Sequence, residues 1–294
     1  MLFRTLIFVP SNNKRFVEKA KALNADIICF DLEDSVPANE KDIARQLIND
    51  ALAQRTKYRS AFYVRINSLQ SDLALRDLSA VVKTGIDGIV IPKVNDENEI
   101  QDIDHQVSTI EKKQNIRNDS TRLIPSIESA KGVVNAYYIA KSSRRVNALL
   151  FGIFDFLHDM GVDYDEKNGF EQYNYGRSKV PVDARAAGVE SIDGIWQQVE
   201  DIEGLTSDTI VAKRLGYSGK SIIHPSHIDP VHRIFAPTDA QISWATKVVE
   251  ALEAAMGRGN GRGALTIEGK MVDAVHYKQA KAILDSRIDA RSKL

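Results

Sequence analysis

Short apolar segments alternate with amphipathic segments along most of the chain, and this alternation restricts the possible folds more than any other feature. Each apolar segment has the length and aliphatic content of a strand that is buried on both faces of a parallel sheet. Eight such strands are expected, at residues 4–10, 25–37, 60–67, 85–94, 123–128, 149–155, 191–195 and 219–225. Because a helical segment follows each of them, the pattern predicts an α/β fold, a (β/α)8 TIM barrel.

The composition changes near Gly257, where the sequence GRGNGRG indicates a flexible hinge. We therefore expect residues 1–256 to form the barrel and residues 257–294 to form the hinge and a C-terminal helical arm. A closed barrel does not need such an arm, so the arm could pack on its own barrel or on a neighbouring subunit. Asp273 lies directly ahead of the helix of the arm and would move with it.

The composition is typical of a globular protein, with 43% hydrophobic and 27% charged residues. The longest apolar stretches are strand-sized, so we expect no membrane partner and a cytoplasmic location. The net charge of −1 gives no general attraction for nucleic acid. The C-terminal tripeptide Ser292-Lys293-Leu294 matches a peroxisomal address, which makes the peroxisome the alternative location. Cys29, the single cysteine, lies in an apolar run and is expected to be a buried, unreactive thiol.

Two carboxylates end neighbouring apolar segments near the middle of the chain. Glu128 follows residues 123–127, and Asp155 follows residues 149–154. A helix between the two segments would return the chain to the same edge of the sheet, so both acids are expected at neighbouring strand ends. The C-terminal edge of a parallel barrel is where such folds place their chemistry. The pair is therefore a candidate site for a divalent metal ion.

Further charged residues are expected at the same edge, and each has two interpretations. Glu33 and Asp34 could orient metal-bound water, or one of them could cap the turn that follows. Arg65 could bind a carboxylate with two parallel hydrogen bonds, or it could form a salt bridge to Glu33 or Asp34. Lys93 could be a Schiff-base amine, but a lysine at a strand end is more often the ion-pair partner of nearby acids.

Three other features are candidates for a role at the site. Lys14 and Arg15 open the helix after the first strand, where they could contact a phosphate or simply face solvent. His224 follows the last strand, but no HxH or HExxH spacing supports a zinc site, so we expect it to be structural or to support other site residues. The segment 162–180 is the longest one without periodicity, and an irregular loop of that length could cover the site.

Eight short motifs resemble those of the HpcH/HpaI aldolase superfamily, in its citrate lyase β-subunit-like branch with malyl-CoA and citramalyl-CoA lyases. In order along the chain they are FVPSNNKRF, FDLEDSVP, VRIN, IPK, IESAKG, FGIFDF, GKSIIHP and IEGKMVD. The chain departs from the pattern of this branch at Ser11, where glycine is commoner, at Phe154, where glutamate is frequent, and at Val275, where proline is usual. None of these departures removes an expected metal ligand.

The resemblance implies both a site and an assembly. Glu128 and Asp155 would hold Mg²⁺, and Arg65 would bind the carboxylate of a 2-oxo acid. The CoA group would lie near the basic residues of the N-terminal helix. Asp273 would reach the site of an adjacent protomer in a homotrimer or hexamer, as the acid or base that exchanges a proton with the acetyl group.

The expected function is that of a Mg²⁺-dependent carbon–carbon lyase that cleaves or forms a 3-hydroxyacyl-CoA. Citramalyl-CoA, malyl-CoA and citryl-CoA are the candidate substrates, each giving acetyl-CoA and a 2-oxo acid. Three alternatives remain open. The chain could be a citrate lyase β subunit that acts only within a larger complex, a condensing thioesterase like malate synthase, or a Schiff-base aldolase that uses Lys93.

Overall fold

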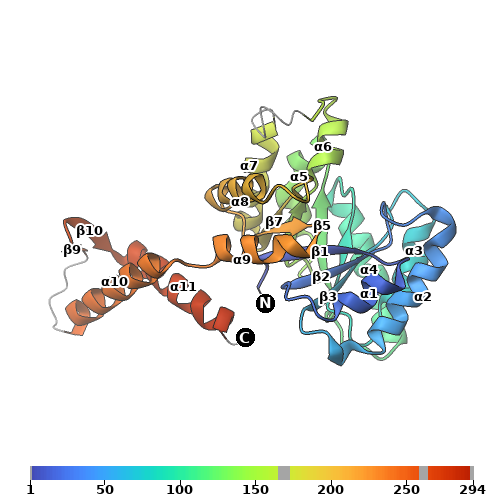
Figure 1. Ribbon diagram of the computed structural model, residues 1–294, viewed down its shortest axis with the longest axis horizontal. Coiled ribbons are helices and arrows are strands. Elements are labelled where there is room, and N and C mark those ends of the chain that lie inside the picture. Colours follow the sequence, from blue (N-terminus) through green and yellow to red (C-terminus); the bar gives the residue numbers. More distant parts are fainter. Residues whose placement is uncertain (1, 165–172, 258–263, 292–294) are drawn as a thin grey trace. The chain divides into compact units, whose positions relative to one another are not determined.

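The computed structural model describes residues 2–164, 173–257 and 264–291. Eight parallel strands form a closed barrel in which each strand pairs with its neighbours in the sequence and the last pairs with the first (Figure 1). The strands are β1 Thr5–Pro10, β2 Ile27–Asp31, β3 Ala61–Arg65, β4 Gly88–Ile91, β5 Arg122–Ile127, β6 Ala148–Phe151, β7 Glu190–Asp193 and β8 Gly219–Ile222. The predicted TIM barrel is confirmed.

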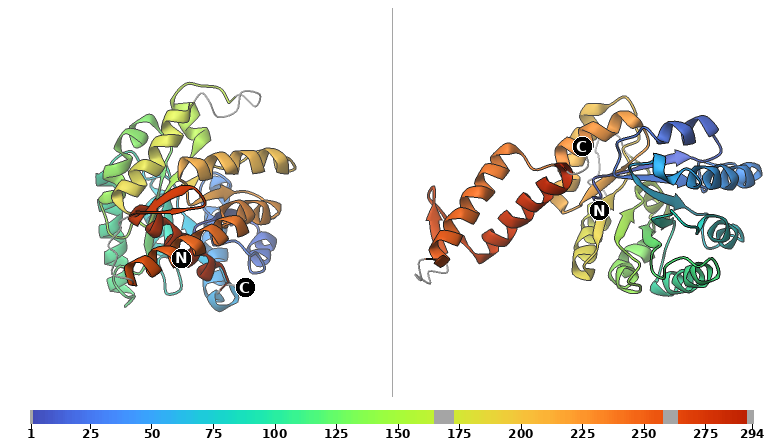
Figure 2. Two further views of the ribbon diagram at one scale, coloured as in Figure 1. Left: turned by 90° about the vertical axis from the view of Figure 1, so that its left-hand side faces the viewer. Right: turned by 90° about the horizontal axis from the view of Figure 1, so that it is seen from below.

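A helix follows each strand, and the helices surround the barrel on its outer side (Figures 1 and 2). They are α1 Lys14–Ala20, α2 Lys41–Leu52, α3 Leu73–Val81, α4 Glu97–Lys113, α5 Ala130–Lys141, α6 Ile153–Asp159, α7 Asn174–Ala187, α8 Ile202–Leu215 and α9 Ile228–Phe235. Short 3₁₀ turns precede α2 and α9. None of the helices in the described part of the chain has the length and apolar character needed to cross a membrane.

Aliphatic and aromatic side chains fill the inside of the barrel. Leu6, Cys29, Tyr63, Ile124 and Ile192 belong to one cluster, and each comes from a different strand. Cys29 is buried, as the sequence predicted, and burial raises the pKa of its thiol well above the ordinary value. A packed interior leaves the loops at the strand ends as the place for a ligand.

The structure corrects the expected strand at residues 149–155. Strand β6 ends at Phe151, and α6 begins at Ile153, so Asp155 lies in the first turn of a helix and not at a strand end. The change occurs at Gly152, whose carbonyl accepts the first helical hydrogen bond, from the N–H of Phe156. An apolar run can supply both a buried strand and the buried face of a helix, so periodicity does not locate the boundary.

The expected irregular segment 162–180 is also shorter than predicted, because α7 already begins at Asn174. Residues 165–172 of that segment lie outside the described residues, as do the glycine-rich residues 258–263 and the tripeptide Ser292-Lys293-Leu294.

The chain divides into two compact units, and the first ends at His232. The second begins at Arg233 and contains α10 Asp239–Gly257, the antiparallel hairpin of β9 Ala264–Ile267 and β10 Lys270–Asp273, and α11 Ala274–Arg291. This boundary precedes the predicted one at residue 257. The reason is that Val248 and Leu252 of α10 pack with Val272 and Ala280 in one apolar cluster, which makes α10 part of the second unit.

Candidate active site

A cavity of about 340 Å³ opens at the C-terminal edge of the barrel, and we call it the site cavity. Its polar lining consists of Asp31, Ser35, Arg65, Glu128, Asp155 and Ser221. Its apolar lining consists of Phe8, Pro10, Leu150, Phe151, Gly152, Ile153, Phe154, Ile195 and Ile223. Three residues predicted from the sequence, Arg65, Glu128 and Asp155, therefore face one cavity.

Glu128 follows β5 directly and is 5% exposed. The backbone of Gly152 lies against it, since a Cβ atom there would come within 2.4 Å of the Glu128 Cγ atom. Only glycine fits this close approach. Burial, together with the charges of Glu33 and Asp155, raises the pKa of the Glu128 carboxyl to about 7. The ionised form would therefore gain from a cation placed in the cavity.

Arg65 is held by Asp31, which the sequence analysis had not considered as its partner. Nε and Nη2 of Arg65 each donate to an oxygen of Asp31 at 2.7 Å. Nη1 of Arg65 lies 3.2 Å from Oε2 of Glu33. Of the two salt-bridge partners predicted for Arg65, Glu33 therefore forms an ion pair with it, whereas Asp34 pairs with Lys93. Asp31 on β2 lies directly opposite Arg65 on β3. Because both residues end their strands and carry opposite charges, the sequence could have suggested this pair.

The Asp31–Arg65 pair is ionised on both sides. Burial alone would raise the pKa of Asp31, but Arg65, Ser35 and the N–H of Glu33 together hold it below the ordinary value. Burial would likewise lower the pKa of Arg65, and the neighbouring carboxylates raise it instead. The guanidinium carbon of Arg65 also lies 4.5 Å from the centre of the Phe8 ring, which supports its plane from one side.

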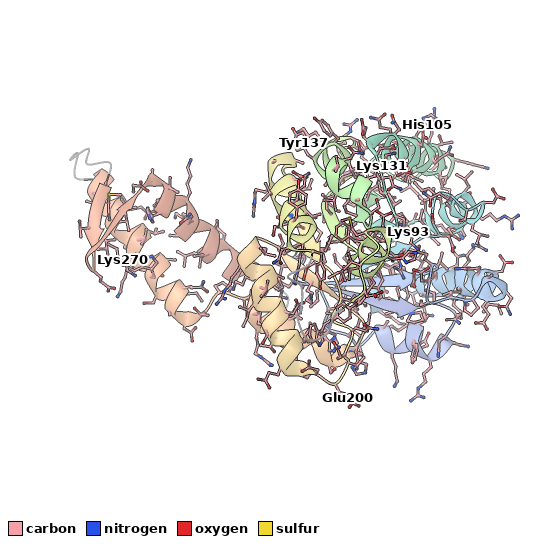
Figure 3. The ribbon with its side chains drawn as sticks, turned by 90° about the horizontal axis from the view of Figure 1, so that it is seen from above. Lys93, His105, Lys131, Tyr137, Glu200 and Lys270 are labelled. Atoms are coloured by element: carbon pink, nitrogen blue, oxygen red, sulfur yellow. The ribbon has the colours of Figure 1, made fainter. Side chains whose placement is uncertain are left out.

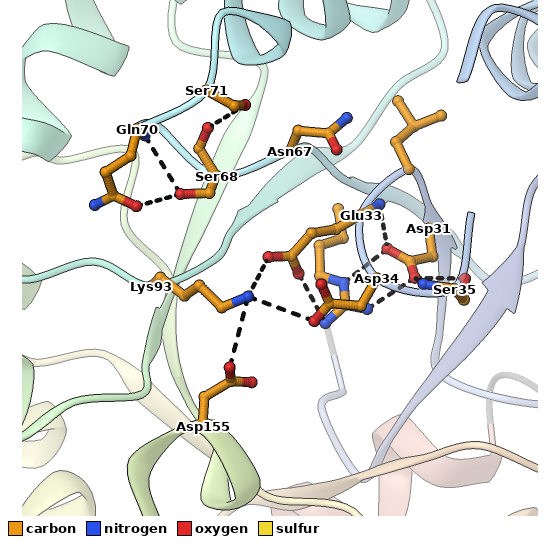
Figure 4. Close-up of polar contacts among 12 residues, drawn as sticks. Asp31, Glu33, Asp34, Ser35, Asn67, Ser68, Gln70, Ser71, Lys93 and Asp155 are labelled. Carbon is orange, nitrogen blue, oxygen red and sulfur yellow. Dashed lines mark hydrogen bonds and ion pairs between the residues drawn. The ribbon is translucent and has the colours of Figure 1, made fainter. Parts of the chain in front are cut away.

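Lys93 lies on the loop after β4, among the polar side chains at this edge (Figure 3). Its Nζ atom is 2.9 Å from Glu33, 3.5 Å from Asp34 and 3.5 Å from Asp155 (Figure 4). Its backbone has φ of +55°, a left-handed conformation that non-glycine residues adopt uncommonly. Burial would lower the pKa of the ammonium, but Glu33 and the two aspartates raise it above the ordinary value.

These contacts favour the ion-pair interpretation of Lys93 over the Schiff-base one. A Schiff-base lysine must be neutral to attack a carbonyl, which requires a lowered pKa. The pKa of Lys93 is shifted in the opposite direction. Its ammonium group instead balances two acids from the loop after β2, Glu33 and Asp34, and Asp155 from the first turn of α6.

The charges at this edge fit a divalent cation. Five carboxylates gather here, those of Asp31, Glu33, Asp34, Glu128 and Asp155, against the three cations Arg65, Lys93 and Lys41. Within the described ranges no group of three or more His, Cys, Asp or Glu side chains is arranged to hold a metal. The cavity-lining acids Glu128 and Asp155 suit Mg²⁺, which prefers oxygen ligands and keeps several positions for water or substrate.

A second cavity, of about 300 Å³, adjoins the site cavity and shares Phe8, Pro10 and Ile223 with it. We call it the α1 cavity, because Phe16, Lys19, Ala20 and Leu23 from α1 and the turn after it line it. His224 also lines this cavity.

Lys14 and Arg15 are exposed in the first turn of α1, where Asn13 caps the helix. Among the described lining residues of the two cavities neither of them appears. They lie on α1, the helix that also carries Phe16, Lys19 and Ala20 of the α1 cavity. The side chain of His224 accepts a hydrogen bond from the backbone N–H of Ser226 and so caps a short turn.

Asp273 belongs to the second unit, at the end of β10 and directly before α11. Its Oδ1 atom accepts a hydrogen bond from the N–H of Val275 at 2.9 Å and contacts Nδ1 of His276 at 2.8 Å. The hydrogen bond with His276 lowers the pKa of the carboxyl. His276 was not among the expected site residues. It occupies the third position of α11, from which a side chain can reach back to the residue that caps the helix.

Residues 4–225 match the family described as HpcH/HpaI aldolase/citrate lyase. The chain is 33% identical to the citrate lyase subunit beta of Haemophilus influenzae, over 97% of this chain and 96% of that one. It is 30% identical to a (3S)-malyl-CoA thioesterase of Cereibacter sphaeroides, over 96% of this chain and 93% of that one.

A solved structure extends the likeness to the fold. The protein CitE of Mycobacterium tuberculosis, in complex with magnesium, acetoacetate and coenzyme A, aligns with a TM-score of 0.76 and 26% identity. The alignment covers 96% of this chain and 97% of that one. The match to the family extends over most of the barrel, and the curated relatives match almost the whole chain. The chain therefore belongs to the HpcH/HpaI aldolase/citrate lyase family of enzymes.

Proposed function

We propose that this enzyme is a Mg²⁺-dependent carbon–carbon lyase that converts a 3-hydroxyacyl-CoA into acetyl-CoA and a 2-oxo acid, or catalyses the reverse condensation. The observation that carries the proposal is the placement of Glu128, Asp155 and Arg65 around one cavity. Two acids for a metal ion and a guanidinium for a carboxylate are the groups that this reaction requires. Relatives named as citrate lyase subunit beta and citramalyl-CoA lyase support the reaction type.

Each residue of the cavity has a separate task in the proposed reaction. Glu128 and Asp155 would hold Mg²⁺, which, when bound, lowers the pKa of the substrate hydroxyl and stabilises charge on the same oxygen. Arg65 binds the carboxylate of the 2-oxo acid through the N–H groups that Asp31 and Glu33 leave available. Asp31 keeps the guanidinium in one orientation, so the reacting carbon is held in place before the bond changes.

The thioester would extend into the α1 cavity. This cavity continues from the site cavity, and one of its walls is apolar. Lys14 and Arg15 would then meet the CoA phosphates at the start of α1, where the helix dipole also favours an anion. Lys19 lines the cavity itself and adds a third positive charge on the same helix.

Asp273 is the proposed acid and base of the reaction. In cleavage the substrate hydroxyl would lose its proton to water while the acetyl group departs as an enolate, and Asp273 would donate a proton to the enolate carbon. In condensation it would remove that proton. Its Oδ1 atom is fixed by Val275 and His276, which leaves Oδ2 as the oxygen for proton transfer.

We place Asp273 in the site of a neighbouring protomer of a homotrimer or hexamer, because the barrel is closed without the second unit. Complementation tests this arrangement. Mixing Asp273→Ala chains with Glu128→Gln chains should restore part of the activity after subunit exchange, since some sites then combine both intact residues. Activity no higher than the summed residual rates, with exchange proven, would show that Asp273 acts within its own chain or not at all.

The proposed reaction is tested with the purified chain alone, acetyl-CoA, Mg²⁺ and glyoxylate, pyruvate or oxaloacetate. Formation of an acyl-CoA adduct that EDTA abolishes is the expected result. Stoichiometric release of free CoA would indicate a condensing thioesterase instead. No turnover of CoA esters, but turnover with added partner subunits, would indicate a component of a larger complex. Activity in EDTA with trapping by borohydride would restore Lys93 as a Schiff-base residue.

A further inference from the structure

We infer that the site cavity selects a 2-oxo acid with one carboxylate and an uncharged substituent, and that it rejects a dicarboxylic 2-oxo acid. This inference rests on the proposed function and names its substrate class. Glyoxylate and pyruvate belong to the accepted class, and oxaloacetate to the rejected one. Cleavage of a citryl thioester releases oxaloacetate, so the inference favours malyl or citramalyl thioesters as substrates.

The side chains of the site cavity supply few hydrogen-bond donors to a second carboxylate. A second carboxylate needs donors or a cation to replace the water that it loses. Besides Arg65, the described polar side chains of the lining are three acids and two hydroxyls. The Ser35 hydroxyl donates its hydrogen to Asp31 at 2.5 Å, and the Ser221 hydroxyl donates to the carbonyl of Asp193 at 2.9 Å. A hydroxyl has one hydrogen, so neither serine can donate to a second carboxylate.

Arg65 has room for one carboxylate only. Of its five N–H groups, two are bound to Asp31 and a third faces Glu33 at 3.2 Å. The remaining two suffice for the two oxygens of a single carboxylate. In the proposed reaction the carboxylate of the oxo acid takes them.

Lys41, another cation at this edge, already donates to the carbonyl groups of Leu32 and Glu33. Lys93 is engaged as well. It does not line the site cavity among the described residues, and three carboxylates surround its ammonium group. A substrate anion would have to displace Glu33 or Asp155 to reach it. The first turn of α6 also faces the cavity, and its backbone N–H groups have no side-chain cap and favour an anion. The carboxylate of Asp155 in the same turn opposes one.

The substituent of the oxo acid is therefore left with the apolar lining. Ile153, Phe154, Ile195 and Ile223 are part of that lining, which suits a hydrogen or a methyl group. A carboxylate there would be desolvated without a side-chain donor from the described lining, close to the acids Glu128 and Asp155. We expect kcat/KM for oxaloacetate to be about 100-fold lower than for pyruvate, the usual consequence of leaving one charged group unpaired.

The experiment uses the wild-type chain with Mg²⁺ and compares three acids. Pyruvate, oxaloacetate and 4-methyl-2-oxopentanoate are each condensed with acetyl-CoA, and their binding without acetyl-CoA is measured by calorimetry. The third acid carries an isopropyl group in place of the second carboxylate of oxaloacetate, so it matches the size but not the charge. We expect pyruvate and 4-methyl-2-oxopentanoate to bind, and oxaloacetate to bind about 100-fold more weakly than pyruvate.

The outcomes separate this inference from the proposed function. Equal or tighter binding of oxaloacetate overturns the inference, even if the lyase reaction is found. Weak binding of both larger acids also overturns it, because size and not charge would then select the substrate. If pyruvate binds in preference to oxaloacetate but no acid is condensed, the inference stands and the proposed reaction fails.

Discussion

Two adjacent arginines, Arg144 and Arg145, should differ strongly in what they contribute to stability. The side chain of Arg145 is fully buried and binds Glu111, also fully buried, at 2.8 Å and Asp104 at 2.6 Å. The side chain of Arg144 is 84% exposed and makes one ion pair, to Asp119 at 3.3 Å. The two positions form a matched comparison, because the same substitution can be made one residue apart.

Arg145→Met should lower the free energy of unfolding by about 3–5 kcal/mol, since it leaves Glu111 buried without its cation. Arg144→Met should cost less than about 1 kcal/mol, as is usual for exposed pairs. For a unit of this size the melting temperature falls by roughly 2–4 °C per kcal/mol. Thermal unfolding followed by circular dichroism should therefore show a fall of roughly 6–20 °C for Arg145→Met and under about 4 °C for Arg144→Met.

The pH dependence gives an independent check. Burial alone would raise the pKa of Glu111, but Arg145 and Thr121 hold it below the ordinary value. The stabilisation from a lowered carboxyl pKa is complete at neutral pH and is lost as the pH falls towards that pKa. In Arg145→Met the buried carboxyl keeps only its weaker partners and takes up a proton at higher pH. The stability difference between wild type and Arg145→Met should therefore shrink when unfolding is measured at pH 5 instead of pH 8.

A double variant decides whether the unpaired charge is the cause. Replacing both partners, in Arg145→Met with Glu111→Leu, should recover much of the loss, because no charge is then left buried alone. Equal losses for Arg144→Met and Arg145→Met would refute the reasoning. So would a double variant that is less stable than Arg145→Met.

Three further predictions concern the site and the barrel interior. Glu128→Gln should abolish activity and also the stabilisation that Mg²⁺ gives in thermal unfolding. The exposed control Asp34→Asn should still be stabilised by Mg²⁺. Near-normal turnover of Glu128→Gln in EDTA would contradict the metal site. Arg65→Lys should raise the KM for the 2-oxo acid at least about tenfold, because an ammonium group cannot form two parallel hydrogen bonds to Asp31 and two more to a substrate carboxylate. An unchanged KM would show that Arg65 has only a structural role. Cys29 should react with a thiol reagent only after unfolding in urea, since burial raises its pKa; rapid labelling of the folded protein would show that the barrel opens.

The sequence determined the barrel because burial leaves a local trace. A strand that is buried on both faces must be apolar over four to six residues, and a helix that covers it must be apolar on one face. These requirements act on neighbouring residues, so the order of the elements can be predicted without knowing any contact. The same rule placed Glu128, Arg65 and Lys93 after three strands and so at one edge of the barrel.

The choice of partners needed the tertiary structure. Asp31, Glu33 and Asp34 are close together in sequence, yet Asp31 takes the two-pronged bond to Arg65 because the two lie in register on adjacent strands. Arg144 and Arg145 are chemically identical, and only their placement relative to α4 makes one exposed and the other buried.

The boundaries of elements and units also depended on distant contacts. The run before Asp155 is apolar, and the chain leaves the strand at Gly152, where its backbone lies against the side chain of Glu128. Helix α10 reads as part of the barrel in sequence, but its apolar residues pack with those of the hairpin and α11. The apolar pattern of the sequence shows which segments are buried, whereas residues far away in sequence decide what they pack against and whether a charged side chain such as Arg145 is buried with them.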